Sequence, residues 1–134
     1  MNGSVTILPD GWKRPKGYAN AIIMPRGRLL FIAGQVGWDV HERMVSEDFV
    51  AQFKQALLNV RTCVEAAGSR VDCIGRITLY VTDKQEYAAS LKGVGEAWRE
   101  IMGRHYPAMA LLEVKGLLEQ GAKVEVEADA VVPE

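Results

Sequence analysis

The chain has 134 residues, with 16 basic and 17 acidic side chains and a formal net charge of −1. This length suits one domain with its own core, so we expect a single domain over residues 1–134, with residues 1–16 as an N-terminal arm. The charge balance gives no reason to expect nucleic acid or an anionic membrane as a partner. No apolar run could span a bilayer, and residues 1–11 lack the regions of a signal peptide, which predicts a cytoplasmic protein.

Short extended segments follow one another in the N-terminal part of the chain. Residues 8–18 are dense in proline, glycine and cations and should form a loop. Residues 20–24 and 29–34 have the composition of strands joined by a proline-glycine turn, so the simple prediction is a hairpin. The second strand ends in Gly34 and Gln35, and a glycine corner of this kind favours close approach of the backbone to another segment or a ligand.

Two amphipathic helices are predicted in the middle of the chain. From Phe49 onward apolar residues recur every three or four positions, and Gly68 ends this stripe as a C-terminal cap would. Residues 74–81 then alternate as a strand. Asp83 and Glu86 form a plausible capping box for a second helix. We expect its apolar stripe to be core, and it consists of Tyr87, Leu91, Val94, Trp98, Ile101 and Met102.

The C-terminal part predicts two more strands around a turn-rich connector, residues 115–121. In the last strand apolar and acidic residues alternate, so Glu125, Glu127 and Asp129 share one face. Surface strands commonly alternate in this way, and a solvated outer face is therefore the plain interpretation. Repulsion among like charges also favours protonation of a shielded carboxyl, which is the condition for general acid/base work near neutral pH.

The predicted order of elements is strand, strand, helix, strand, helix, strand, strand. Two helices with one apolar stripe each can cover one face of a sheet, which predicts a two-layer α/β sandwich. The other face would carry Arg76, Thr78 and Tyr80, the three acids, and Met109, Leu111 and Glu113 on a third strand. A face of this mixed polarity is best covered by another copy of the chain. We therefore expect a closed homo-oligomer with its pockets between subunits.

Other classes of site find little support in the sequence. His41 and His105 lie far apart, and the segment around His41 has weak spacing for metal ligands. No serine stands in a nucleophile elbow, and no glycine-rich phosphate loop is present. The sequence thus indicates neither a metal nor a cofactor.

Several segments together resemble one known family. They are Gly17-Tyr18, Phe31 to Gln35, Gln52 to Asn59 with Ala66-Ala67-Gly68, Ile77 to Asp83, Tyr106-Pro107-Ala108 and Val124 to Ala128. In order and spacing they resemble the RidA family, also called YjgF/YER057c/UK114, from about Gly17 to Val132. The resemblance implies a chorismate-mutase-like sandwich with a mixed sheet, a homotrimer, and a small-molecule pocket at each subunit interface. It also implies hydrolysis of reactive enamines and imines, such as 2-aminoacrylate, to a ketoacid and ammonia.

The resemblance implies site residues position by position. The family's cleft tyrosine falls on Tyr18, and the glutamate that orients the attacking water falls on Glu125. The glycine-glutamine corner falls on Gly34 and Gln35, with Ala33 where many members have serine. These residues are the expected catalytic pair and part of the expected substrate-binding set.

The main departure from the family is Met109. Deaminating members have an arginine there that clamps the substrate carboxylate, and methionine cannot form such a pair. A pocket-lining asparagine is replaced by Lys92. The sequence leaves three readings open: an imine without a carboxylate at that position, a cation supplied from elsewhere, or binding without catalysis. Met109 and Trp38 would suit a more apolar or aromatic imine, and Leu111 is expected to bind substrate with them. The candidate cations are Lys92, Arg14 and Arg76.

Two classes of function follow. One is an imine or enamine hydrolase of altered specificity that uses Glu125 and Tyr18. The other is a non-catalytic trimeric binder or sensor of small molecules that keeps the same cleft, a hypothesis that rests on Met109 and Ala33. Some family members have been described as ribonucleases, but the net charge of −1 and the lack of a histidine pair give that reading no independent support.

Overall fold

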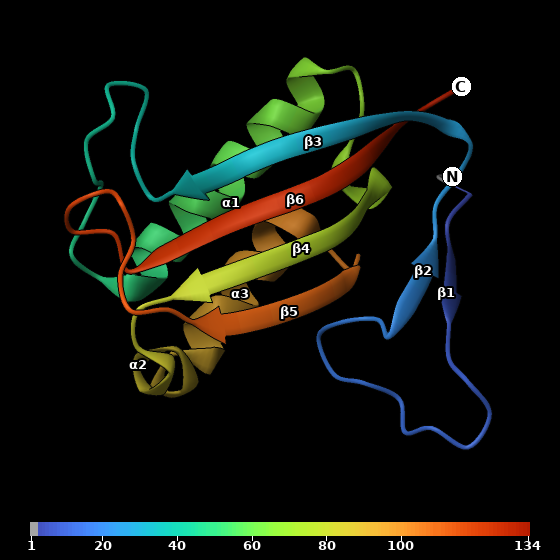
Figure 1. Ribbon diagram of the computed structural model, residues 1–134, viewed down its shortest axis with the longest axis horizontal. Helices are drawn as coiled ribbons and strands as arrows, with labels where there is room; N and C mark the ends of the chain where they lie inside the picture. Colours follow the sequence, from blue (N-terminus) through green and yellow to red (C-terminus); the bar gives the residue numbers. More distant parts are fainter. Residues whose placement is uncertain (1–2) are drawn as a thin grey trace.

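The main sheet has four strands, and both long helices lie behind one of its faces (Figure 1). This computed structural model describes residues 3–134. The sheet has the order β3-β6-β4-β5. Its strands are β3 (Gly27–Val36), β4 (Ile74–Val81), β5 (Ala108–Glu113) and β6 (Val124–Pro133). The helices are α1 (Phe49–Ala66), α2 (Lys84–Ala89) and α3 (Leu91–Met102), with a 3-10 turn η1 (Val71–Cys73).

The sheet is mixed, as predicted. β6 runs antiparallel to both β3 and β4, whereas β4 and β5 are parallel. The parallel pair follows from the chain order, because α2 and α3 connect β4 to β5 and a helical crossover returns the chain in the same direction. The two-layer α/β sandwich predicted from the sequence is thereby confirmed. No helix of the described chain is long and apolar enough to cross a bilayer.

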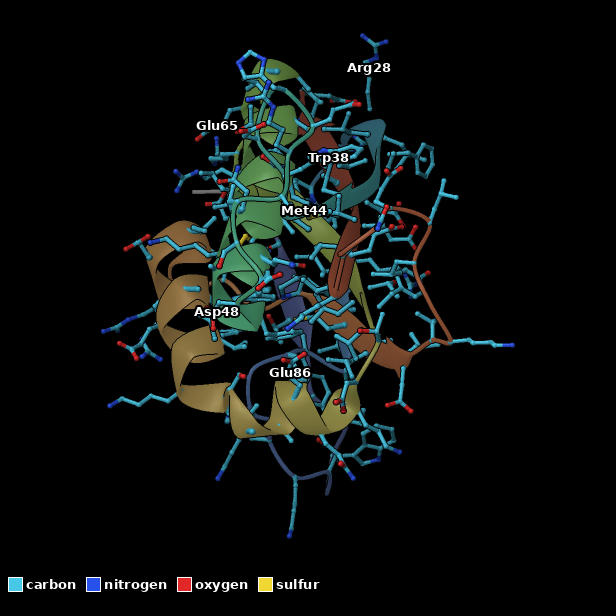
Figure 2. The ribbon with its side chains drawn as sticks, turned by 90° about the vertical axis from the view of Figure 1, so that its left-hand side faces the viewer. Arg28, Trp38, Met44, Asp48, Glu65 and Glu86 are labelled. Atoms are coloured by element: carbon cyan, nitrogen blue, oxygen red, sulfur yellow. The ribbon has the colours of Figure 1, made fainter. Side chains whose placement is uncertain are left out.

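The core lies between α1, α3 and one face of the sheet. The predicted stripe of α1 is buried, with Phe53, Leu57 and Val60 at 1% exposure or less, and it packs with Val124 and Val126 of β6 in one hydrophobic cluster. Figure 2 shows both helices on the same side of the sheet. The alternation read from the sequence therefore identifies correctly which face of β6 is covered.

Side-chain caps determine where α1 and α2 begin. The carboxylate of Asp48 accepts a hydrogen bond from the backbone N–H of Ala51 and begins α1. Asp83 accepts bonds from Gln85 and Glu86 and begins α2, which confirms the predicted cap. The carboxylate of Glu86, however, pairs with Lys123, 3.3 Å away, rather than completing a capping box.

The predicted second helix is interrupted at Ser90, where α2 ends and α3 begins. The Ser90 hydroxyl donates a 2.7 Å hydrogen bond to the carbonyl of Glu86. Serine bonded to the carbonyl four residues earlier commonly bends a helix. The apolar stripe continues through the break at Ser90, so the stripe alone does not predict the break.

The predicted hairpin of residues 20–24 and 29–34 is wrong. β2 (Ala21–Ile23) pairs instead with β1 (Val5–Ile7) in a separate two-stranded sheet, and β1 lies in the segment expected to be an arm. β3 pairs along its length with β6. The ten residues of β6 offer β3 a far longer ladder than the short β2 could, and turn residues alone do not decide between such partners.

The face of the sheet away from the helices carries polar and apolar groups together. Tyr80, Glu125 and Glu127 are partly exposed there, and Leu29 and Phe31 of β3 are each 72% exposed. No helix or loop of the described chain covers these apolar side chains. We call this surface the open face.

Candidate functional site

Glu125 lies on the open face and is held beside a bulge in β3. It stands opposite Val36 on β3 and Tyr80 on β4. The register between β3 and β6 shifts between Ile32 and Gln35, which places Gly34 in the bulge. A Cβ atom at Gly34 would overlap the carboxylate of Glu125. The glycine corner predicted from the sequence thus makes room for the predicted catalytic carboxylate.

A second polar pair lies next to Glu125. The hydroxyl of Tyr80 donates a 2.6 Å hydrogen bond to Oε1 of Glu127. This bond to a carboxylate raises the pKa of Tyr80, and desolvation and the charges of Glu127 and Glu125 act in the same direction. The phenol therefore stays protonated at neutral pH. Its one proton is donated to Glu127, so Tyr80 fixes that neighbouring carboxylate rather than offering a donor to Glu125.

Gln52 holds the start of β6 in place from α1. Its side chain is 1% exposed, and its amide nitrogen donates to the carbonyls of Ser46 and Gly121, both at 2.9 Å. Its amide oxygen accepts from the backbone N–H of Lys123 at 2.8 Å. Because Lys123 is two residues before Glu125, these bonds help to position the carboxylate.

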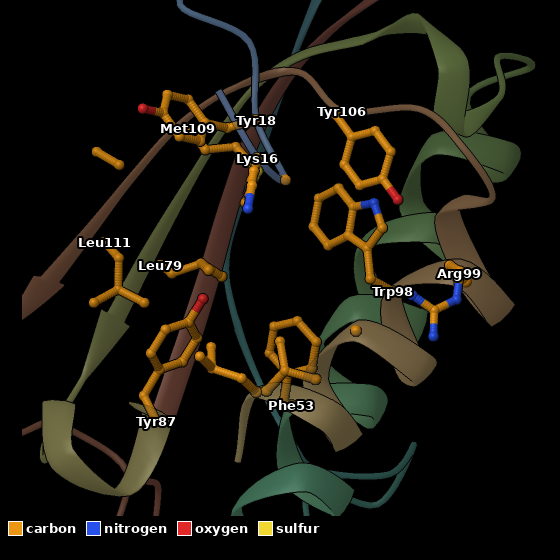
Figure 3. A pocket seen from close by; sticks show the side chains of 15 residues that line it. Lys16, Tyr18, Phe53, Leu79, Tyr87, Trp98, Arg99, Tyr106, Met109 and Leu111 are labelled. Carbon is orange, nitrogen blue, oxygen red and sulfur yellow. The ribbon is translucent and has the colours of Figure 1, made fainter. Parts of the chain in front are cut away.

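A cavity of about 610 Å³ lies on the helix side of the sheet, between β5 and α3. Figure 3 shows aromatic rings on its walls, with Trp98 stacked on Tyr106 at 6.0 Å between ring centroids. The loop before β2 contributes Lys16 and Tyr18 at the rim. The remaining lining residues are Gly17, Phe53, Leu79, Tyr87, Leu91, Val94, Gly95, Arg99, Met109, Ala110 and Leu111.

Met109 and Leu111 line this cavity, which differs from the face that the sequence analysis assigned to them. In the parallel register Met109 stands beside Ile77 and Leu111 beside Leu79, and both neighbours point toward the helices. Met109, Leu111 and Glu113 do share a face, but it is the helix face. The alternation correctly places these three residues on one face of β5. Only the register of β5 with β4 decides that this face points toward the helices.

The predicted site residues fall into two groups in one chain. Tyr18, Met109 and Leu111 meet at the cavity. Glu125 lies on the other side of the sheet, where it contacts Gly34. Ala33 and Gln35 accompany Gly34 in the bulged strand, and the Gln35 amide donates to the Ala33 carbonyl at 3.1 Å.

Two predicted binding residues do not reach the cavity. Trp38 forms an isolated bridge with Met44 in the loop between β3 and α1, and its carbonyl accepts from Asn59 at 2.9 Å (Figure 2). Lys92 is exposed in the first turn of α3 and is not among the lining residues.

The other cations named as replacements for the missing arginine do not line the cavity either. Arg76 lies on the open face, 3.9 Å from Asp129. Arg14 is exposed in the N-terminal loop. The cations that do line the cavity are Lys16 and Arg99, which the sequence analysis missed. The sequence offered one signal for Lys16, its position two residues before the expected site residue Tyr18.

The chain is similar to known proteins over most of its length. The family model described as endoribonuclease L-PSP matches residues 12–132. A 2-iminobutanoate/2-iminopropanoate deaminase of Salmonella typhimurium is 35% identical over 105 residues, which cover 78% of this chain and 80% of that protein. Protein DfrA of Myxococcus xanthus is 30% identical over 119 residues, 85% of this chain and 84% of that protein.

Solved structures show the same fold. The Rid-family protein YyfB from Yersinia pestis superposes with a TM-score of 0.87 at 28% identity, covering 98% of this chain and 100% of that one. A YjgF/YER057c/UK114-family protein from Mycobacterium tuberculosis gives a TM-score of 0.65 at 31% identity, covering 87% and 88%. The chain therefore belongs to the RidA (YjgF/YER057c/UK114) family, to which the segments of its sequence also pointed.

Proposed function

We propose that the protein hydrolyses reactive enamines and imines and releases ammonia, with a substrate range altered by Met109. The observation that carries this proposal is the carboxylate of Glu125, held on the open face by the bulge at Gly34. The names of its relatives as 2-iminobutanoate/2-iminopropanoate deaminases support the reaction class.

The complete site requires more than one chain. Tyr18 and Met109 open on one side of the sheet and Glu125 lies on the other, so no small substrate touches all three in a single copy. Phe31 and Leu29 expose apolar surface on the same face as Glu125, which favours association there. A homotrimer with three equivalent intersubunit clefts would bring the Glu125 of one chain to the Tyr18 rim of its neighbour.

The chemistry asks little of the protein. An enamine first tautomerises to its imine, water then adds to the imine carbon, and the carbon–nitrogen bond breaks to leave a carbonyl compound and ammonia. Glu125 would accept a proton from the attacking water and return it to the departing nitrogen. Tyr18, at the rim of the cavity, would hold the substrate against the carboxylate.

Met109 changes what the site can anchor. It offers the substrate a thioether in an apolar wall, where an arginine would form a bidentate pair with a carboxylate. Loss of such a charged hydrogen-bonded pair typically removes about 1.5 to 3 kcal/mol, or roughly ten- to a hundredfold in affinity. Small imino acids with little else to bind should therefore be poor substrates.

A coupled assay of ammonia release tests the proposal. Imines are generated in situ from amino acids of varied side chain and from amines without a carboxylate. The wild type is compared with Glu125→Gln and with Asp129→Asn, a matched change on the same face of β6. Turnover that Glu125→Gln abolishes and Asp129→Asn preserves supports a hydrolase. Equal turnover by wild type and Glu125→Gln contradicts it.

A second function, binding without turnover, is favoured by one observation. Among residues 3–134 of one chain, no aspartate or glutamate lines the cavity that holds Tyr18 and Met109, so the pocket has a carboxylate for acid/base work only if a neighbouring chain supplies Glu125. A non-catalytic trimeric binder or sensor would use the pocket in this form. Saturable binding of a ligand together with inertness toward every imine would favour this function over the hydrolase.

A further inference from the structure

The cavity between β5 and α3 is much larger than a small imino acid requires. Its volume of about 610 Å³ lies within the range of pockets that enclose drug-sized ligands, about 300 to 1,000 Å³. 2-Iminopropanoate would leave most of the aromatic and aliphatic wall without contacts, and unfilled apolar space forfeits dispersion energy. The shape therefore favours a ligand with a large apolar group.

Gly95 enlarges this cavity from the middle of α3. A glycine inside a helix is less stable than alanine by about 1 kcal/mol. A Cβ at Gly95 would meet only the end of the Arg99 side chain, at 3.5 Å, and no positive φ demands glycine there. By contrast, a Cβ at Gly93 would come within 2.8 Å of Val50. Packing thus accounts for Gly93, whereas Gly95 leaves space in the cavity.

The polar groups of the cavity are cationic or neutral. The ammonium of Lys16 points into it, and so does the hydroxyl of Tyr87 (Figure 3). Burial raises the pKa of Tyr87, and within residues 3–134 its hydroxyl has no hydrogen-bond partner. Neither Lys16 nor Arg99 belongs to an ion pair of the described chain. These groups suit a ligand that carries negative charge and a hydrogen-bond acceptor.

We propose that the cavity binds the aryl group of a 2-imino acid derived from an aromatic amino acid, and that Lys16 pairs with its carboxylate. The aryl group would lie against the stacked Trp98 and Tyr106, with Phe53 as the floor. Lys16 at the rim then replaces the carboxylate clamp that Met109 cannot provide. The binding step is independent of the proposed function, whereas turnover of this substrate rests on it.

The reaction would balance without any cofactor. The imine of an aromatic 2-imino acid takes up one water, its carbon–nitrogen double bond becomes a carbon–oxygen double bond, and ammonia leaves. The product is an aryl 2-oxo acid such as phenylpyruvate. Because this product is stable in water, it can serve as a probe of the cavity when turnover is absent.

Isothermal titration calorimetry with phenylpyruvate, pyruvate and phenylacetamide tests the binding step. The wild type should bind phenylpyruvate about tenfold or more tightly than pyruvate, because a buried phenyl ring adds apolar contact. Gly95→Leu fills the cavity and should lower that affinity about tenfold or more. Met109→Trp fills it from β5 and should have the same effect, which protects the test if one variant misfolds.

The role of Lys16 is tested with a matched pair of cations. Lys16→Gln should weaken phenylpyruvate binding about tenfold while leaving phenylacetamide, which has no carboxylate, unchanged. Lys13→Gln removes a nearby exposed cation that does not line the cavity. It should change the affinity for neither phenylpyruvate nor phenylacetamide. Equal loss with Lys13→Gln and Lys16→Gln would overturn the assignment of Lys16.

The two proposals fail in different ways. Phenylpyruvate binding that Gly95→Leu abolishes, together with no ammonia from any imine, would uphold the aryl cavity and reject the hydrolase. Ammonia release from 2-iminopropanoate with equal affinity for pyruvate and phenylpyruvate would reject the aryl cavity and uphold the hydrolase. Unaltered phenylpyruvate binding by folded Gly95→Leu and Met109→Trp would also overturn the aryl cavity.

Discussion

Gly34 and Glu125 are in contact across the β3–β6 pair, and the missing side chain of one leaves room for the carboxylate of the other. The contact occurs where the ladder shifts register, so it depends on the bulge as well as on the glycine. The carboxylate therefore has a defined place on an otherwise exposed face.

Gly34→Ala should displace the carboxylate of Glu125 and lower kcat/KM for imine hydrolysis about a hundredfold or more, the usual contribution of a general base. Its Tm should change little, because the side chain of Glu125 is partly exposed and can move. The ammonia-release assay and a thermal melt measure both. Gly116→Ala is the control, since an added Cβ there meets no atom within 4 Å. A Gly34→Ala variant with wild-type kcat/KM would show that the position of the carboxylate does not matter.

Met109→Arg should lower the KM for 2-iminopropanoate about ten- to a hundredfold, because a guanidinium at this position can pair with the substrate carboxylate. Met109→Leu keeps an apolar side chain of similar size and should leave the KM unchanged. Steady-state kinetics on both variants provide the comparison. If Met109→Leu and Met109→Arg have the same KM for 2-iminopropanoate, the absence of an arginine at position 109 does not explain poor binding of small imino acids.

Gln52→Leu should lower the free energy of unfolding by about 2 to 4 kcal/mol, because it removes three part-buried hydrogen bonds and leaves backbone groups of Ser46, Gly121 and Lys123 without their partner. Urea denaturation measures the change. Gln55→Leu, one turn along the same helix, breaks a single bond to Asn59 and should cost about 1 kcal/mol or less. Equal effects of the two substitutions would contradict the role given to Gln52.

Tyr80 should ionise above the ordinary tyrosine pKa of 10.0, because its hydroxyl donates to the Glu127 carboxylate. The difference in ultraviolet titration between wild type and Tyr80→Phe isolates this phenol, and Glu127→Gln should lower its midpoint. Since the folded pKa is raised, the stability that Tyr80 contributes is present below the unfolded pKa. It is lost as the pH rises through the folded value. A midpoint unaffected by Glu127→Gln would rule out the proposed cause.

Gly95→Ala and Gly93→Ala should have opposite effects on stability, although the two glycines lie only two positions apart on α3. Gly95→Ala gains helix propensity without a clash and should raise the free energy of unfolding by up to about 1 kcal/mol. Gly93→Ala makes the same gain but pushes its Cβ against Val50, so it should destabilise. Chemical denaturation of both variants is the measurement. If both substitutions stabilise the protein, Val50 can move away from an added Cβ at position 93 at little energetic cost.

The sequence by itself determined the local features. The alternation in residues 124–130 identifies the buried face of β6, and the spacing from Phe49 to Val64 identifies the buried stripe of α1. Asp83 marks the start of α2. Each of these signals depends only on residues within a few positions along the chain, because strand and helix periods and side-chain caps are local geometry.

Only the tertiary structure decided how these elements meet. The pairing of Ile77 with Met109 turns Met109 toward the helices, and no pattern within β5 contains that information. The same pairing brings Met109 to Trp98 and Lys16 and separates it from Glu125 by the thickness of the sheet. Strand register and partner choice depend on contacts between distant segments. In β5, where both sets of alternating side chains are largely apolar, the pattern therefore groups residues on a face without saying which side that face takes.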